Sequence, residues 1–264
     1  MHLQRDDEVV TLGPLTSTVV DRAEWCAETY PAWPEWQPVA DEAERLFAFA
    51  ESRGVFEMYL PRLTRGRSRE RDSALGELRV AFYFHRNDFR IAEWCPSGEG
   101  STKGEFTLEC PTGEPIFVEV KNLGWESEVS QEARVAGRTK QPKYVSGEGL
   151  VIANDQALKS AVEKAYPKFS SSRRNLLVVL DDLFLPMRYL TDTWARAALY
   201  RPSQGKFTTT SHQRLGGIGC FWRNELRGEI LYDMPLFVNP NALPSCALPE
   251  VFALAFHGRV PTAG

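Results

Sequence analysis

Helical and strand-like patterns of apolar residues alternate through the middle of the chain. Apolar residues at helical spacing predict a helix that begins near Asp72 or Ser73 and ends near His85, and a second helix over 154–169. Turn residues at 111–115 predict a hairpin between two strands. Short apolar runs predict the strands themselves, at 89–94, 106–110, 116–121 and 176–180. Helix, three strands, helix and strand in this order predict a mixed α/β sandwich.

The two flanks of this middle part follow different patterns. The pattern from about Ser17 to Arg53 is helical but interrupted by prolines, and a capping Asp41 opens its clearest helix. Beyond Leu183, a helix over about 186–200 precedes a stretch rich in Gly, Pro and Asn that is typical of β structure. We therefore predict an N-terminal helical extension, an α/β core and a C-terminal α/β extension packed on that core, over residues 1–70, 71–184 and 185–264.

Composition places the chain among ordinary globular proteins. Of its 264 residues, 43% are hydrophobic and 25% charged, so it can bury a sizeable core. It has no apolar run of about 20 residues, and its first residues are charged where a signal peptide would be apolar. Its five cysteines are scattered and form no Cys-x-x-Cys pair, which is typical of free thiols in a reducing compartment. We expect a cytoplasmic protein with no membrane partner.

Two basic stretches stand out against a formal net charge of −4. Five arginines and a single acidic residue lie between Arg62 and Arg71, and a second stretch covers 134–143. Either stretch could contact phosphates, or it could be a solvated loop. Because both lie beside the residues discussed next, we take seven side chains as candidate nucleic-acid-binding residues: Arg65, Arg67, Arg69, Arg134, Arg138, Lys140 and Lys143.

The predicted strand at 116–121 carries two charges among apolar residues. Side chains alternate along a strand, so Phe117, Glu119 and Lys121 share one face. Unpaired charge is costly to bury. The segment is therefore either an exposed edge strand or a central strand that carries a functional pair, and the strand alone leaves both interpretations open.

The hairpin turn adds a second carboxylate to this pair. It would bring Glu105, at the start of the first strand, close to Glu119 and Lys121 at the end of the second. Two carboxylates form a hard-oxygen site suited to Mg²⁺ or Mn²⁺, which accept few carboxylates together with water and substrate phosphate. The lysine could orient or deprotonate an attacking water while the metal stabilises charge at phosphorus.

A third carboxylate lies in the helix that precedes the strands. This helix is apolar on nearly all sides, which indicates burial, so Glu77 needs a cation or a metal nearby. Arg79 or Arg90 could be that cation. The neighbouring Gly76 indicates close approach of another segment.

Taken together, Glu77 on a helix, Glu105 at the start of a hairpin and Glu119-Val120-Lys121 at its end resemble the PD-(D/E)XK nuclease superfamily. That superfamily has a restriction-endonuclease-like core, built from a helix, a three-stranded meander, a helix and a further strand. Residues 73–182 are predicted to follow this order. The resemblance implies a hydrolase of phosphodiester bonds in nucleic acid, an endonuclease with DNA as the favoured substrate.

The resemblance also implies a role for each matching residue. Glu105, Glu119 and the Val120 carbonyl would bind Mg²⁺. Lys121 would position the nucleophilic water, and Glu77 would complete the metal shell directly or through water. The predicted helix from Ala157 to Phe169, with Lys164 and Lys168, resembles the superfamily helix after the catalytic lysine that often faces substrate, although no catalytic role is assigned to these lysines.

One position departs from the superfamily pattern and keeps an alternative open. The first hairpin carboxylate is usually an Asp preceded by Pro, whereas this chain has Lys103-Gly104-Glu105, and the extra methylene moves the carboxylate outward by roughly one carbon–carbon bond. The alternative is a catalytically degenerate nuclease-fold module that binds nucleic acid or a protein partner without cutting. A third interpretation is a metal-free enzyme that acts on a small molecule. A homodimer would suit a double-strand cut, and a larger defence or repair complex is the other assembly considered.

Overall fold

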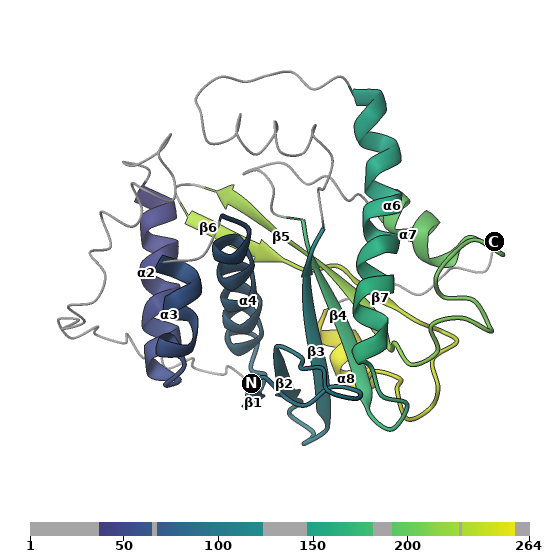
Figure 1. Ribbon diagram of the computed structural model, residues 1–264, viewed down its shortest axis with the longest axis horizontal. Helices are drawn as coiled ribbons and strands as arrows, with labels where there is room; N and C mark the ends of the chain where they lie inside the picture. The colour runs from purple at the N-terminus through teal and green to yellow at the C-terminus, as the bar shows by residue number, and fades with distance from the viewer. Residues whose placement is uncertain (1–36, 65–67, 124–146, 182–191, 227–228, 257–264) are drawn as a thin grey trace, which may run out of the picture.

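A computed structural model describes residues 37–64, 68–123, 147–181, 192–226 and 229–256 (Figure 1). The predictions for the first 36 residues, including Cys26, lie outside these ranges. The four cysteines within them are free thiols, as expected: Cys95, Cys110, Cys220 and Cys246. None of the described helices is long and apolar enough to span a membrane.

A seven-stranded mixed sheet forms the centre of the molecule, in the order β1-β2-β3-β4-β5-β6, with β7 paired to the first part of β5. The strands are β1 (Arg90–Trp94), β2 (Phe106–Glu109), β3 (Pro115–Asn122), β4 (Arg174–Leu180), β5 (Gly217–Leu226), β6 (Glu229–Asp233) and β7 (Leu236–Val238). Strands β1 to β3 form an antiparallel meander, whereas β4 is parallel to both β3 and β5. The predicted hairpin is confirmed, since Phe106 pairs with Val118 and Glu109 with Pro115.

Helices cover both faces of this sheet (Figure 1). They are α2 (Gln37–Ser52), α3 (Phe56–Thr64), α4 (Ser68–Arg86), α6 (Gly147–Ala165), α7 (Asp192–Tyr200) and α8 (Glu250–Ala255), with a 3₁₀ turn η1 (Tyr166–Lys168) directly after α6. Helices α4 and α8 pack on one face, and α6 and α7 pack on the other. Helices α2 and α3 form a further cluster with α4.

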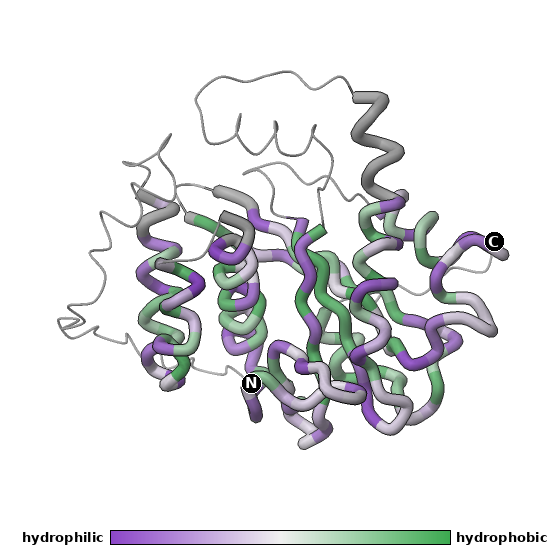
Figure 2. Tube along the Cα trace, in the orientation of Figure 1, coloured by the Kyte–Doolittle hydropathy of each residue, from purple (hydrophilic) through white to green (hydrophobic). Residues whose placement is uncertain are grey.

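The alternation of side chains along β3 separates the two hydrophobic cores. Ile116, Val118 and Val120 are buried against α4, while Phe117 is buried on the α6 side. Apolar residues run along the central strands between the more mixed helices (Figure 2). The polar side chains of β3 that share a face with Phe117 therefore lie on the α6 side of the sheet.

The mixed α/β class predicted from the sequence is confirmed, although some boundaries differ. Helix α4 begins at Ser68 and not at Asp72 or Ser73, because the charged first turn of a helix has the same composition as a polar loop. The short helix α8 was not predicted, since six residues give too little periodicity to identify a helix.

Candidate functional site

Glu119 and Lys121 lie on a strand with neighbours on both sides. Strand β3 pairs with β2 along its first half and with β4 through Asn122. The side chain of Glu119 is 0% exposed, so the interpretation of an exposed edge strand is wrong. The strand therefore buries a carboxylate in its hydrophobic centre, where that group needs compensation.

Two lysines provide part of this compensation. Glu119 Oε1 forms ion pairs with Lys121 Nζ and with Lys168 Nζ, the latter at 2.6 Å. The Lys168 ammonium also donates to the backbone carbonyl of Lys103 at 2.8 Å. In contrast, Glu119 Oε2 is buried and has no hydrogen-bond partner among the described residues. The carboxylate is thus neutralised on one oxygen and left open on the other.

Glu105 lies beside Glu119, as the hairpin predicts. The Glu105 N–H donates to the Val118 carbonyl at 3.0 Å, which extends the β2–β3 ladder by one residue. The preceding Gly104 packs on the ring of Phe117, where a Cβ would lie only 2.4 Å from a ring carbon. A glycine before the carboxylate therefore lets this segment approach β3 closely.

The environment of Glu105 favours its protonated form. Burial, with the negative charges of Glu77 and Glu119, raises its pKa to about 8, against a partial opposing effect of Lys168 and Lys121. Glu105 forms no ion pair or side-chain hydrogen bond within the described residues. This side chain is thus a carboxyl group that a nearby cation would help to ionise.

Glu77 lies close enough to influence Glu105, but it is held by a different cation. Both oxygens of Glu77 accept hydrogen bonds from Arg62, each at 2.6 Å, and Ser73 Oγ adds a longer contact at 3.3 Å. This bidentate pair joins α3 to α4 and raises the pKa of Arg62. The two arginines considered from sequence bind elsewhere: Arg79 pairs with Glu42, and Arg90 with Glu109.

Two further side chains near the carboxylates were not recognised from sequence. Burial, Glu77 and Glu105 raise the pKa of the Tyr59 hydroxyl. Burial, followed by the same two carboxylates, raises the pKa of the Cys95 thiol, whose backbone N–H donates to the Glu105 carbonyl. Cys95 also has a positive φ of 52°, which a non-glycine residue seldom adopts. Burial and the nearby negative charges therefore favour the protonated forms of the Tyr59 hydroxyl and the Cys95 thiol.

The donor atoms of this site suit a hard divalent cation. Within the described residues, no three carboxylate, thiol or imidazole groups form a ready-made metal cluster, and cations already engage Glu77 and Glu119. However, Mg²⁺ often takes only one or two carboxylates and completes its shell with water and substrate oxygens. The open Oε2 of Glu119 and the carboxyl of Glu105 are such donors, and the Val120 carbonyl lies on the same stretch of β3.

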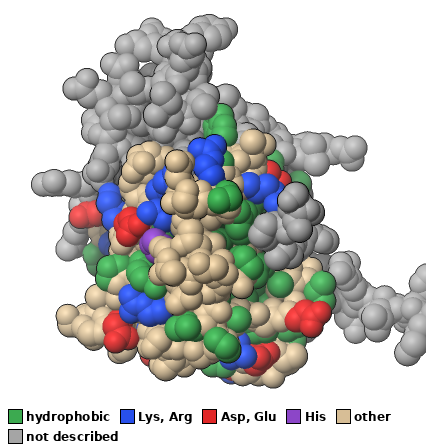
Figure 3. Space-filling view, turned by 90° about the vertical axis from the view of Figure 1, so that its right-hand side faces the viewer, with side chains coloured by type: hydrophobic (Ala, Val, Ile, Leu, Met, Phe, Trp, Pro, Cys, Tyr) green, Lys and Arg blue, Asp and Glu red, His purple; other side chains and the backbone are tan. Residues whose placement is uncertain are grey.

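The predicted nucleic-acid-binding side chains all lie outside the described residues: Arg65, Arg67, Arg69, Arg134, Arg138, Lys140 and Lys143. For Arg69 only the backbone, in the first turn of α4, is described. On the face that Figure 3 shows, lysine and arginine side chains lie in several separate groups with acidic side chains among them. The interface with nucleic acid therefore stays a prediction.

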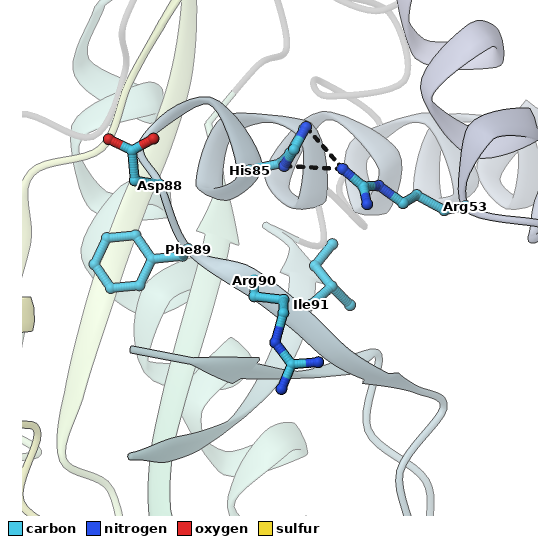
Figure 4. A pocket seen from close by; sticks show the side chains of 6 residues that line it. All are labelled: Arg53, His85, Asp88, Phe89, Arg90 and Ile91. Atoms are coloured by element: carbon cyan, nitrogen blue, oxygen red, sulfur yellow. Dashed lines mark hydrogen bonds between the residues drawn. The ribbon is translucent and has the colours of Figure 1, made fainter. Parts of the chain in front are cut away.

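A pocket of about 280 Å³ lies beside the C-terminal end of α4 (Figure 4). Its lining residues are Arg53, His85, Asp88, Phe89, Arg90 and Ile91. Arg53 and His85 point toward one another and are joined by a hydrogen bond of 2.9 Å. Burial, with Arg53 and Arg86 nearby, lowers the pKa of His85. The pocket shares no residue with the carboxylate site.

Comparisons of the chain with protein-family models, curated proteins and solved structures gave no significant match.

Proposed function

We propose that the protein is a divalent-metal-dependent nuclease with a restriction-endonuclease-like core of the PD-(D/E)XK superfamily, and that it hydrolyses phosphodiester bonds in DNA. The observation that carries this proposal is the meeting of Glu105, Glu119 and Lys121 on one hairpin, with a buried carboxylate oxygen that lacks a partner among the described residues. The element order α4, β1–β3, α6, β4 supports the proposal, because it is the order of that superfamily's core.

The chain's own donors suggest how such a site would work. Glu105, Glu119 and the Val120 carbonyl would hold Mg²⁺ or Mn²⁺, which when bound supplies positive charge at the phosphoryl oxygens and lowers the pKa of water. Lys121 has three N–H donors and one acceptor, Glu119, among the described residues. Its other donors can orient the attacking water against phosphorus. The water oxygen would lose a proton to solvent and form the new bond to phosphorus, while the bond to the leaving oxygen breaks and that oxygen takes a proton from solvent.

The balance of charge in the site is consistent with this reaction. With Glu105 ionised, three carboxylates face the three cations Arg62, Lys121 and Lys168. A divalent ion would then leave an excess of about two positive charges, which balances the two negative charges of a phosphodiester and an attacking hydroxide. Site and reactants would therefore be close to neutral as a whole.

One observation favours a second candidate, the degenerate module that binds nucleic acid or a protein partner without cutting. Arg62 and the two lysines already neutralise Glu77 and Glu119 without a metal. Burial and the neighbouring carboxylates raise the pKa of Glu105, which replaces the usual aspartate, to about 8. In a site that has lost its catalytic activity, these ion pairs would serve stability alone.

Cleavage of a mixed panel tests the two candidates. Plasmid DNA, single-stranded DNA and RNA are incubated with Mg²⁺ or Mn²⁺ and with wild type, Glu119→Gln, Lys121→Ala or the control Glu93→Gln, which alters an exposed glutamate on β1. The nuclease proposal predicts metal-dependent cutting, unchanged in Glu93→Gln and at least about 100-fold slower in the two site variants. Full activity of Lys121→Ala would contradict the mechanism. If no substrate of the panel is cleaved and the protein binds no Mn²⁺, the degenerate module would be favoured.

A further inference from the structure

One ammonium group touches both segments that carry the hairpin carboxylates. Lys168 is the last residue of η1, and its Nζ lies 2.6 Å from Glu119 Oε1 on β3. The same Nζ donates at 2.8 Å to the carbonyl of Lys103, two residues before Glu105. Its side chain is 22% exposed, so these contacts are shielded from most of the solvent. Lys168 thus connects the segment before β2 with the end of β3.

The turn that carries Lys168 is itself fixed to the loop between β1 and β2. The Lys168 carbonyl accepts a hydrogen bond from the Glu99 N–H at 3.0 Å. Arg173 donates to the Ser97 carbonyl at 2.6 Å, while its guanidinium lies over the ring of Phe117 at 3.8 Å from the centroid. The backbone of η1 and the side chain of Arg173, which follows η1 and precedes β4, therefore hold the loop that leads to Glu105.

The two lysines at Glu119 have different sets of contacts. Lys121 engages a single acceptor among the described residues, which leaves donors for water or substrate. Lys168 engages a carboxylate and a backbone carbonyl, which belong to the two segments that bear Glu119 and Glu105. Its geometry suits a group that fixes the distance between ligands better than one that acts on the reactants.

We propose that Lys168 is a positioning residue of this site: it holds Glu105 and Glu119 at the separation needed to bind a divalent cation together. This inference rests on the proposed function. The positioning role and the positive charge of Lys168 predict opposite effects on the affinity for a cation. Removing a positive charge beside Glu119 would by itself strengthen the binding of a cation, whereas removing the bridge leaves two ligands that are no longer pre-organised.

Calorimetric binding of Mn²⁺ to the full chain separates the two effects. Lys168→Met removes both charge and donors, Lys168→Gln removes the charge but keeps N–H donors, and Lys164→Met changes an exposed lysine of α6 as a control. We expect Lys168→Met to bind Mn²⁺ about 10- to 100-fold more weakly than wild type. Lys168→Gln should recover part of that loss, and Lys164→Met should match wild type. DNA affinity in EDTA should be the same in all four proteins.

Each other outcome overturns a defined part of the account. Equal or tighter Mn²⁺ binding by Lys168→Met, with wild type binding normally, would overturn the positioning role and leave the proposed function standing. Equal losses in Lys168→Met and Lys168→Gln would also overturn it, because the N–H donors that connect the two segments would then make no difference to the affinity. No Mn²⁺ binding by wild type would overturn the proposed function and this inference with it. If Lys168→Met fails to fold, as judged by its thermal transition, Lys168→Gln decides: Mn²⁺ binding weaker than wild type, as expected of a partly restored connection, supports positioning, and equal or tighter binding overturns it.

Discussion

Among the described residues, Glu42 and Glu119 are the two most deeply buried glutamates, yet their surroundings differ completely. Glu42 on α2 receives hydrogen bonds on both oxygens: Arg79 reaches both, Arg223 reaches Oε2 at 2.9 Å, and Tyr232 reaches Oε1 at 2.8 Å. Glu119 has cations on one oxygen only, and its other oxygen has no partner among the described residues. The first carboxylate is saturated by protein donors, and the second keeps one position open.

The carboxyl pKa values of the two regions are shifted in opposite directions. Burial alone would raise the pKa of Glu42, but Arg223 and Arg79 outweigh it and lower the pKa to about 2. In the other region, burial and two neighbouring carboxylates raise the pKa of Glu105 to about 8. A saturated network joins α2 to β5 and β6, which is a structural task. The second region gathers carboxylates and leaves one carboxylate oxygen without a partner among the described residues, which is consistent with the cation binding that we propose.

The largest expected effects come from making the same change in both regions. Glu42→Gln leaves Arg79 and Arg223 buried without their counter-charge, so we expect the free energy of unfolding to fall by about 3–5 kcal/mol. Glu119→Gln removes a buried charge whose lysine partners are 27% and 22% exposed and can regain water. We expect the free energy of unfolding of Glu119→Gln to lie within about 1 kcal/mol of the wild-type value. Urea unfolding of the two variants measures both values.

The comparison fails if the two variants behave alike. A loss of several kcal/mol in Glu119→Gln would mean that the carboxylate site is a second structural network. A negligible loss in Glu42→Gln would mean that its contacts with arginine contribute little net stability.

The pH dependence of stability gives a smaller effect with a defined sign. The folded-state pKa of Glu42 lies below its ordinary value of 4.5, so ionised Glu42 stabilises the fold above that pH. Its contribution is lost as the pH falls from about 4.5 to about 2. We expect the stability difference between wild type and Glu42→Gln to shrink over this range. Tyr232→Phe keeps the carboxylate and its arginines, so it should lose stability in acid as wild type does. A stability difference between wild type and Glu42→Gln that does not change with pH would contradict this explanation.

The contacts that could be predicted from sequence depend on local geometry. Turn residues at 111–115 set the register of the β2–β3 hairpin, and this register brings Glu105 to Glu119. Alternation along β3 then places Lys121 on the same face. The apolar pattern of α4 likewise indicates the burial of Glu77. Each of these predictions needs only the period of one element or the length of one turn.

The cations that engage these carboxylates could not be predicted in the same way. Arg62 reaches Glu77 from another helix, and Lys168 reaches Glu119 from a 3₁₀ turn after α6. Both contacts depend on how helices pack, which no sequence period specifies. Pro167 inside η1 is a local sign that the helical pattern ends there, but it does not indicate where the next side chain points.

The most direct test of the central claim is diffraction from crystals of the protein soaked in Mn²⁺, with the metal located by its anomalous signal. The account predicts a manganese ion within ligand distance of Glu119 Oε2, the Glu105 carboxylate and the Val120 carbonyl, and no such ion in crystals of Glu119→Gln. Wild-type crystals with no manganese at these three groups, or with manganese bound equally in Glu119→Gln, would contradict it.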